Sequence, residues 1–100
     1  MLFCIVAIDR PGRLDRRKAT RPAHLDYLAQ HKDRVRAAGP FLAKDGTPTG
    51  SMLVVEAKDL AEAEAMVAAD PYTKAGLFES VSVRAWKYTV GTGLPLAKAD

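Results

Sequence analysis

The sequence lacks most of the residue patterns from which common functional sites are built. Its single cysteine, Cys4, excludes an internal disulfide, and its place in an apolar run is typical of a small buried hydrophobe. No His, Cys or carboxylate group has the spacing of a metal site. A glycine-rich phosphate loop and a G-x-S-x-G nucleophile motif are also missing, so we expect neither a metal nor a cofactor.

Long hydrophobic runs are missing as well. The apolar segment Leu2–Ile8 is far too short to cross a bilayer. It follows Met1 with no basic segment before it, which is not the pattern of a signal peptide. We therefore expect a cytoplasmic protein that does not associate with membranes.

The positive charge is modest but unevenly distributed. The net charge is +3, and the stretch Arg10–Arg21 holds six basic side chains with Asp15 as its only acid. Such a stretch could attract anions or nucleic acid, or it could be a solvated connection that leads into a helix. Aromatic residues number seven, and no zinc-finger or RNP-like pattern accompanies them, so nucleic-acid binding is not expected.

The composition suits one globular domain. With 100 residues, of which 48% are hydrophobic, we expect a single domain over residues 1–90 and a flexible C-terminal tail over 91–100. Turn residues divide the domain into six elements. These are a strand Leu2–Ile8, a helix from Pro22 to about Ala38, strands Pro40–Lys44 and Ser51–Ala57 joined as a hairpin, a helix from Asp59 to about Ala69, and a strand region Leu77–Val90.

Capping residues support both helices. Pro22 suits the first position of a helix, Gly39 could supply a left-handed C-cap, and Pro40 would block continuation. Asp59 with Glu62 resembles a capping box at the start of the second helix.

The predicted order of strand, helix, strand, strand, helix, strand is the ferredoxin-like split βαβ pattern. We therefore expect an α+β sandwich with an antiparallel sheet and two helices on one face. The uncovered face invites a homodimer, and Trp86 and Tyr88 fall on one side of the last strand. Alternatively, these two aromatic residues lie under the helices or line a pocket.

The sequence contains a set of five short segments, Arg21–Leu25, Ala38–Pro40, Gly50–Ser51, Ala69–Tyr72 and Gly76–Glu79. Together these segments resemble the YCII-related (YciI-like) family, and the match runs from Met1 to about Tyr88. The resemblance implies a ferredoxin-like domain of the dimeric α/β-barrel type that dimerises by packing its sheets. It also implies a cleft with a catalytic pair at His24 and Asp70. One branch of the family is a dehydrochlorinase of chlorinated hydroquinones that uses this pair.

The local physics of His24 and Asp70 permits both a functional and a structural interpretation. If His24 lies in the first helical turn, the helix dipole disfavours imidazolium, and a neutral ring can act as a general base. A nearby Asp70 carboxylate would fix its tautomer. Read separately, however, His24 could be a surface residue, and Asp70 before Pro71 is a good N-cap.

Neighbouring residues extend the candidate site. Tyr72 could line the same cleft or simply pack, and Arg21 could bind an anionic group of a substrate or be solvated. His31 lies two helical turns from His24, about 10 Å away, which is too far to share a zinc ion.

Two hypotheses for the function share this cleft. The first is a small lyase- or isomerase-like enzyme in which His24 abstracts a proton and Asp70 orients it. The second is a non-catalytic dimeric module that binds a small ligand or a protein. A third hypothesis is nucleic-acid binding through Arg10–Arg21. No substrate follows from the sequence.

Overall fold

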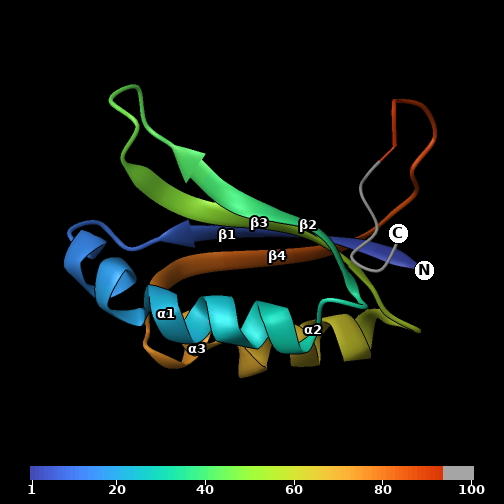
Figure 1. Ribbon diagram of the computed structural model, residues 1–100, viewed down its shortest axis with the longest axis horizontal. Helices are drawn as coiled ribbons and strands as arrows, with labels where there is room; N and C mark the ends of the chain where they lie inside the picture. Colours follow the sequence, from blue (N-terminus) through green and yellow to red (C-terminus); the bar gives the residue numbers. More distant parts are fainter. Residues whose placement is uncertain (94–100) are drawn as a thin grey trace.

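The computed structural model describes residues 1–93 and folds them around one four-stranded sheet (Figure 1). The strands follow the order β2-β3-β1-β4, and each neighbouring pair is antiparallel. The elements in chain order are β1 (Leu2–Asp9), α1 (Leu14–Gln30), β2 (Val35–Leu42), β3 (Pro48–Glu56), α2 (Leu60–Ala69), α3 (Pro71–Lys74) and β4 (Phe78–Trp86).

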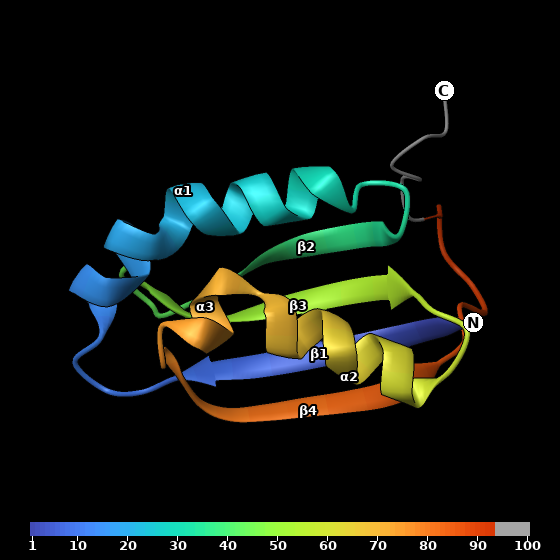
Figure 2. The same cartoon turned by 90° about the horizontal axis from the view of Figure 1, so that it is seen from below.

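All three helices lie on the same face of the sheet (Figures 1 and 2). Seen from the helical side, α1 runs along β2, while α2 lies over the other part of the sheet (Figure 2). This arrangement confirms the predicted α+β, ferredoxin-like βαββαβ sandwich, with the short α3 as an addition after α2.

The core forms where alternate side chains of the central strands meet the helices. In β1, Phe3, Ile5 and Ala7 are buried, as period-two alternation requires of a strand that is covered on one face. Ala63 and Met66 of α2 pack into the same cluster. The apolar run Leu2–Ile8 predicted a buried strand without distinguishing its two faces, and the structure shows that only alternate residues of it are buried.

The first helix differs from its prediction. It begins at Leu14 rather than Pro22, so most of the basic stretch is helical; its basic side chains are exposed except that of Arg17. Pro22 lies inside the helix, where its missing N–H removes one backbone hydrogen bond. The early turns make a tertiary contact, because Arg17 is buried and paired with Asp9.

The second strand also begins earlier than predicted. Gly39 and Pro40 do not cap a helix, because both lie within β2, paired with Met52 and Ser51 of β3. Pro40 is tolerated there because β2 is an edge strand, where a missing N–H costs little. The hairpin that joins the second and third strands is confirmed, and its turn includes Gly46 at a φ of 88°.

The second helix follows its prediction closely. The Asp59 side chain accepts a hydrogen bond from the Glu62 N–H at 2.9 Å, as an N-cap should. Glu62 in turn accepts from the Lys58 N–H rather than from the Asp59 N–H, so the capping box is displaced by one residue.

No helix within residues 1–93 covers the face of the sheet opposite α1, α2 and α3 (Figure 1). Ile8, Met52 and Trp86 are exposed apolar residues on it, and Trp86 contacts Tyr88 edge-to-face. Trp86 therefore does not lie under the helices.

Two other predictions concern the ends of the molecule and its location. The tail predicted for 91–100 falls mostly outside residues 1–93, and the proposed domain limit at residue 90 stays a prediction. No helix within residues 1–93 is long and apolar enough to span a membrane. The cytoplasmic location likewise stays a prediction.

Candidate functional site

His24 and Asp70 are brought together from distant parts of the sequence. The ring Nδ1 of His24 lies 2.8 Å from Oδ1 of Asp70, and both residues are buried. His24 comes from the middle of α1, and Asp70 from the junction between α2 and α3. An Nδ1–H that donates to the carboxylate leaves the lone pair of Nε2 available to accept a proton.

Asp70 also caps the short helix α3. Its Oδ1 accepts a hydrogen bond from the Tyr72 N–H at 2.9 Å, while Pro71 occupies the first helical position. The same oxygen therefore serves the cap and the histidine. The structural and functional interpretations of Asp70 are compatible, because one carboxylate oxygen accepts more than one hydrogen bond.

The electrostatic reason given for a neutral His24 is wrong. His24 lies ten residues beyond Leu14, where α1 begins, so it is not in the first turn. The effect of the helix dipole is confined to the terminal turns and does not act on this ring. What orients His24 is its contact with Asp70 and Tyr72, not its position along the helix.

Tyr72 packs directly against His24. The two rings are stacked, with centroids 3.9 Å apart and planes inclined by 17°, and Phe78 contacts the tyrosine edge-on. Burial raises the pKa of the Tyr72 phenol, and the positive charges of Arg17 and Arg21 only partly oppose this shift. The phenol is therefore protonated at neutral pH and can donate a hydrogen bond.

A second buried polar group, the Asp9–Arg17–Ser51 cluster, was not foreseen from the sequence. Arg17 donates to both carboxylate oxygens of Asp9, at 2.7 and 3.1 Å, and its Nη2 also donates to Ser51 Oγ at 2.8 Å. Burial alone would lower the pKa of Arg17, but the hydrogen bond and charge of Asp9, together with Tyr72, outweigh it and raise the pKa above its ordinary value. The guanidinium also lies over the Tyr72 ring, 4.7 Å from its centroid.

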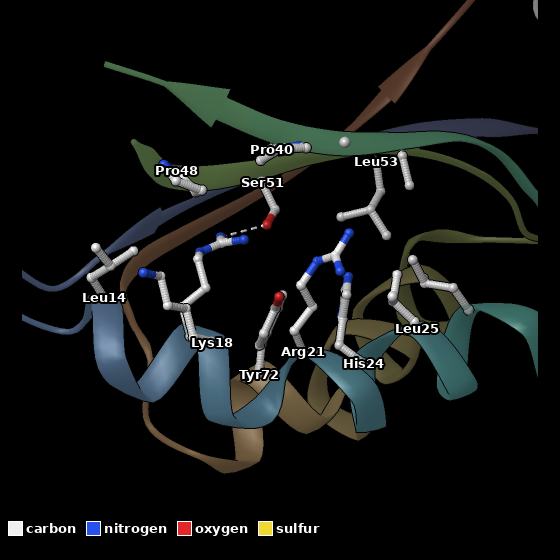
Figure 3. Close-up of a pocket in the computed structure, with 14 residues that line it drawn as sticks. Leu14, Lys18, Arg21, His24, Leu25, Pro40, Pro48, Ser51, Leu53 and Tyr72 are labelled. Carbon is white, nitrogen blue, oxygen red and sulfur yellow. Dashed lines mark hydrogen bonds between the residues drawn. The ribbon is translucent and has the colours of Figure 1, made fainter. Parts of the chain in front are cut away.

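One cavity of about 210 Å³ lies between α1 and strands β2 and β3 (Figure 3). Its polar wall includes His24, Tyr72, Arg17 and Ser51. Figure 3 shows Lys18, Arg21 and His24 extending from α1 toward the sheet, and the hydroxyl of Tyr72 points the same way. The apolar part of the wall comes from Leu14, Leu25, Leu28, Ala38, Pro40, Pro48 and Leu53.

The predicted site residues His24, Tyr72 and Arg21 all line this cavity, and Asp70 supports His24 from behind it. Arg17 and Ser51 line it too, although neither was predicted as a site residue. A signal for Arg17 existed in the spacing of 17, 21 and 24, which places these residues on one helical face. It was missed because the helix was expected to begin only at Pro22.

The remaining candidates lie elsewhere. His31 forms the C-cap of α1, where its ring packs against Tyr27. Cys4 lies on the open face of the sheet and is partly exposed rather than fully buried. Across residues 1–93, no group of three or more potential ligands is arranged to hold a metal ion.

Comparisons with known proteins agree with the sequence resemblance. Residues 1–87 match the YCII-related domain. Protein YciI of Escherichia coli O6:H1 (strain CFT073) is 40% identical over 95 residues, which cover 87% of this chain and 97% of that protein. A Haemophilus influenzae protein is 36% identical over 95 residues, with the same coverage.

Solved structures give the same result. The 5-chloro-2-hydroxyhydroquinone dehydrochlorinase of Burkholderia phenoliruptrix AC1100, in complex with 2,5-dihydroxybenzoquinone, is 41% identical with a TM-score of 0.83. The match covers 89% of this chain and 96% of that one. A putative antibiotic biosynthesis monooxygenase from Bacteroides thetaiotaomicron is similar in fold alone, at 13% identity, a TM-score of 0.57, and coverage of 92% and 91%. The family match over residues 1–87 and these relatives show that the chain belongs to the YCII-related family.

Proposed function

We propose that this protein is a small-molecule enzyme that abstracts a proton with the His24–Asp70 pair, in a lyase- or isomerase-like reaction. The observation that carries the proposal is the 2.8 Å contact between His24 Nδ1 and Asp70 Oδ1 at the edge of a cavity. A histidine held in this way can act as a general base through its other ring nitrogen, toward a substrate in the cavity that the residue lines.

The proposed chemistry needs no cofactor. Nε2 of His24 takes a proton from a substrate carbon, and the electron pair of that C–H bond forms a new double bond. In an elimination, a leaving group departs from the neighbouring carbon with its electron pair. In an isomerisation, another carbon is protonated instead. Asp70 stabilises the imidazolium that forms and keeps its ring oriented.

The cavity sets a limit on the substrate. A dry cavity of about 150 Å³ can hold one benzene molecule. The cavity of about 210 Å³ therefore suits one six-membered ring with a few small substituents. Its apolar walls favour a flat carbon skeleton, while Arg21 and Tyr72 are proposed to bind polar groups of the substrate.

The relative from Burkholderia supports this class of substrate. Its structure contains 2,5-dihydroxybenzoquinone, a flat hydroxylated ring, and its name describes removal of chloride from a hydroxyhydroquinone. At 41% identity and a TM-score of 0.83 the folds correspond, but the substrate of that relative is not assigned to this chain. A hydroxylated quinone is therefore a suitable probe rather than an assigned substrate.

The experiment that tests the proposal is hydrogen–deuterium exchange of 2,5-dihydroxybenzoquinone in heavy water, followed by proton NMR. Each ring C–H of this compound exchanges by protonation at carbon and removal of the original proton, so no leaving group is needed. The wild-type protein should accelerate the exchange, and His24→Asn should lower the catalysed rate by roughly 10²–10⁴-fold. His31→Asn, in the other histidine of the chain, is the matched control and should leave the rate unchanged.

Equal exchange rates in the wild type and in His24→Asn would contradict the catalytic role. If His24→Asn also retains the affinity for the quinone, the result favours the alternative of a non-catalytic module that binds ligands in the same cavity. Loss of both activity and affinity in His31→Asn would point to a site elsewhere.

We further propose that two copies of the chain form a homodimer through the open face of the sheet. Its exposed residues Ile8, Met52 and Trp86 form an apolar surface that water would otherwise contact. Met52→Lys should place a charge in this interface and shift the sedimentation coefficient toward that of a monomer. Lys58→Glu, at an exposed position after β3, is the control. A wild-type protein that sediments as a monomer at high concentration would contradict the proposal.

A further inference from the structure

The Asp9–Arg17–Ser51 cluster lies at the same cavity as His24, but it takes no part in holding the histidine. Arg17 is only 5% exposed and Ser51 only 4% exposed. The charge of Arg17 is matched by Asp9 through two hydrogen bonds, and its Nη2 donates a third to Ser51 Oγ. A buried guanidinium is costly to desolvate, so its placement beside a cavity calls for an explanation.

The hydroxyl of Ser51 is directed by this cluster. Because its oxygen accepts a hydrogen bond from a cation, its own hydrogen must point elsewhere. Within the part of the chain that the structure describes, no group accepts a hydrogen bond from Ser51. The residue lies on the helical side of β3 and lines the cavity, so its O–H is a free donor polarised by Arg17.

The unmatched charges around the cavity have one sign. Lys18 and Arg21 line it, the charge of Arg17 is matched by Asp9, and none of its described lining residues is acidic. Among residues 1–93, neither Lys18 nor Arg21 forms an ion pair. The cavity therefore has a positive potential that favours an anion inside an apolar enclosure.

We propose that Ser51, polarised by Arg17, binds the oxyanion that develops on the substrate while His24 removes its proton. The substrate class is then an enolisable cyclic carbonyl compound or a phenol, with an acidic hydrogen near His24 and an oxygen near Ser51. This inference rests on the proposed function, because it names the substrate class of the same cavity.

The step balances without a further reactant. The proton goes to Nε2 of His24, the C–H electron pair becomes a carbon–carbon double bond, and the π pair of the carbonyl moves onto its oxygen. Ser51 donates a hydrogen bond to this oxygen, as an oxyanion hole does. Arg17 does not touch the oxygen; it is a positioning residue that orients and polarises the serine.

The test is binding of para-nitrophenol, whose ionised form is seen directly by its visible absorbance, with nitrobenzene as the uncharged analogue. The wild-type protein should bind the phenolate more tightly than nitrobenzene and shift the ionisation of the bound phenol to lower pH. Ser51→Ala should weaken phenolate binding roughly ten- to a hundredfold and abolish the shift, because a charge-assisted hydrogen bond is lost. Ser51→Thr, which keeps the hydroxyl, should retain both effects.

Three controls keep the test specific. Nitrobenzene binding should not change in Ser51→Ala, which separates a lost hydrogen bond from altered packing. Ser82→Ala removes a serine from the opposite face of the sheet and should have no effect. Arg17→Lys should reduce the ionisation shift, since a lysine lacks the planar guanidinium that donates to both Asp9 and Ser51. Circular dichroism should show that this variant still folds.

Two results would overturn the oxyanion site. One is a wild-type protein that binds the phenolate no more tightly than nitrobenzene. The other is Ser51→Ala with an unchanged bound-phenol ionisation. If the site holds but His24→Asn leaves carbon exchange unchanged, the proposed function fails while the oxyanion site stands, so the two failures are distinguishable.

Discussion

The two longer helices cover the same face of the sheet but contribute different chemistry. Beneath α2 the packing is closed and apolar, with Ala63 and Met66 against Phe3 and Ile5. Beneath α1 lie buried polar groups and a cavity of about 210 Å³. The difference indicates a division of roles, in which the α2 side supplies stability and the α1 side positions functional groups.

The largest effect on stability is expected on the α2 side. Phe3→Ala should lower the free energy of unfolding by about 3–5 kcal/mol, because it leaves a void in the closed core. Leu42→Ala, at an exposed position, should change it by less than about 0.5 kcal/mol. Urea denaturation measures both, and a loss below about 1 kcal/mol for Phe3→Ala would show that this side is not the stabilising one.

The α1 side should depend on charge pairing rather than on packing. Arg17→Met leaves the buried Asp9 carboxylate unpaired and should cost about 3 kcal/mol. The double variant Asp9→Asn with Arg17→Met should recover part of this loss, since no unpaired charge remains. Arg16→Met, a neighbouring exposed arginine, serves as the control. Additive effects of the Asp9 and Arg17 substitutions in urea denaturation would contradict this view of the pair.

Substitutions of Asp70 test whether its capping of α3 and its contact with His24 can be separated. Asp70→Ala removes the cap of α3 and should cost about 1 kcal/mol of stability. Asp70→Asn keeps an oxygen for the cap and should remain nearly as stable, yet its exchange activity should fall at least about tenfold, because the imidazolium loses its counter-charge. A fully active Asp70→Asn protein would assign this residue to capping alone.

The smallest effect is expected at alkaline pH. Burial raises the pKa values of Tyr27 and Tyr72 above the ordinary value of 10.0. A raised pKa means that the folded state binds the proton more tightly than the unfolded state does. This stabilisation is complete below about pH 10 and is lost as the pH rises through the pKa of the folded state. Replacement of either tyrosine by phenylalanine should therefore make the unfolding free energy, measured by urea denaturation, fall less steeply with pH above about pH 10. An unchanged slope would contradict a raised pKa for that tyrosine.

The sequence predicted the apolar side of the molecule better than the polar one. The continuous apolar run Leu2–Ile8 and the Asp59 cap are local signals, so run length, breaker residues and capping rules were enough to locate β1 and α2. The start of α1 could not be predicted in the same way. Its early turns are stabilised by a buried pair between Arg17 and Asp9, and local propensity carries no information about such a partner.

The site was predicted in part for the same reason. The family pattern named His24 and Asp70, and the structure brings them within hydrogen-bond distance. Ser51 was part of that family pattern but was not predicted as a site residue. Its proposed role depends on a hydrogen bond from Arg17 of α1, and local sequence rules do not predict a contact between two distant elements. The Gly39–Pro40 pair gave a misleading signal, since the same residues suit a helix end and an edge strand.

The central claim is that chemistry takes place at Nε2 of His24 in the cavity beneath α1. It is tested most directly by nitrogen-15 NMR of the two histidine rings during a titration with the dihydroxyquinone used for the exchange experiment. We expect His24 to keep its proton on Nδ1 throughout, while its Nε2 resonance shifts as the ligand binds and the His31 resonances stay unchanged. A His24 ring with its proton on Nε2, or one that does not respond while His31 shifts, would contradict a catalytic role of His24.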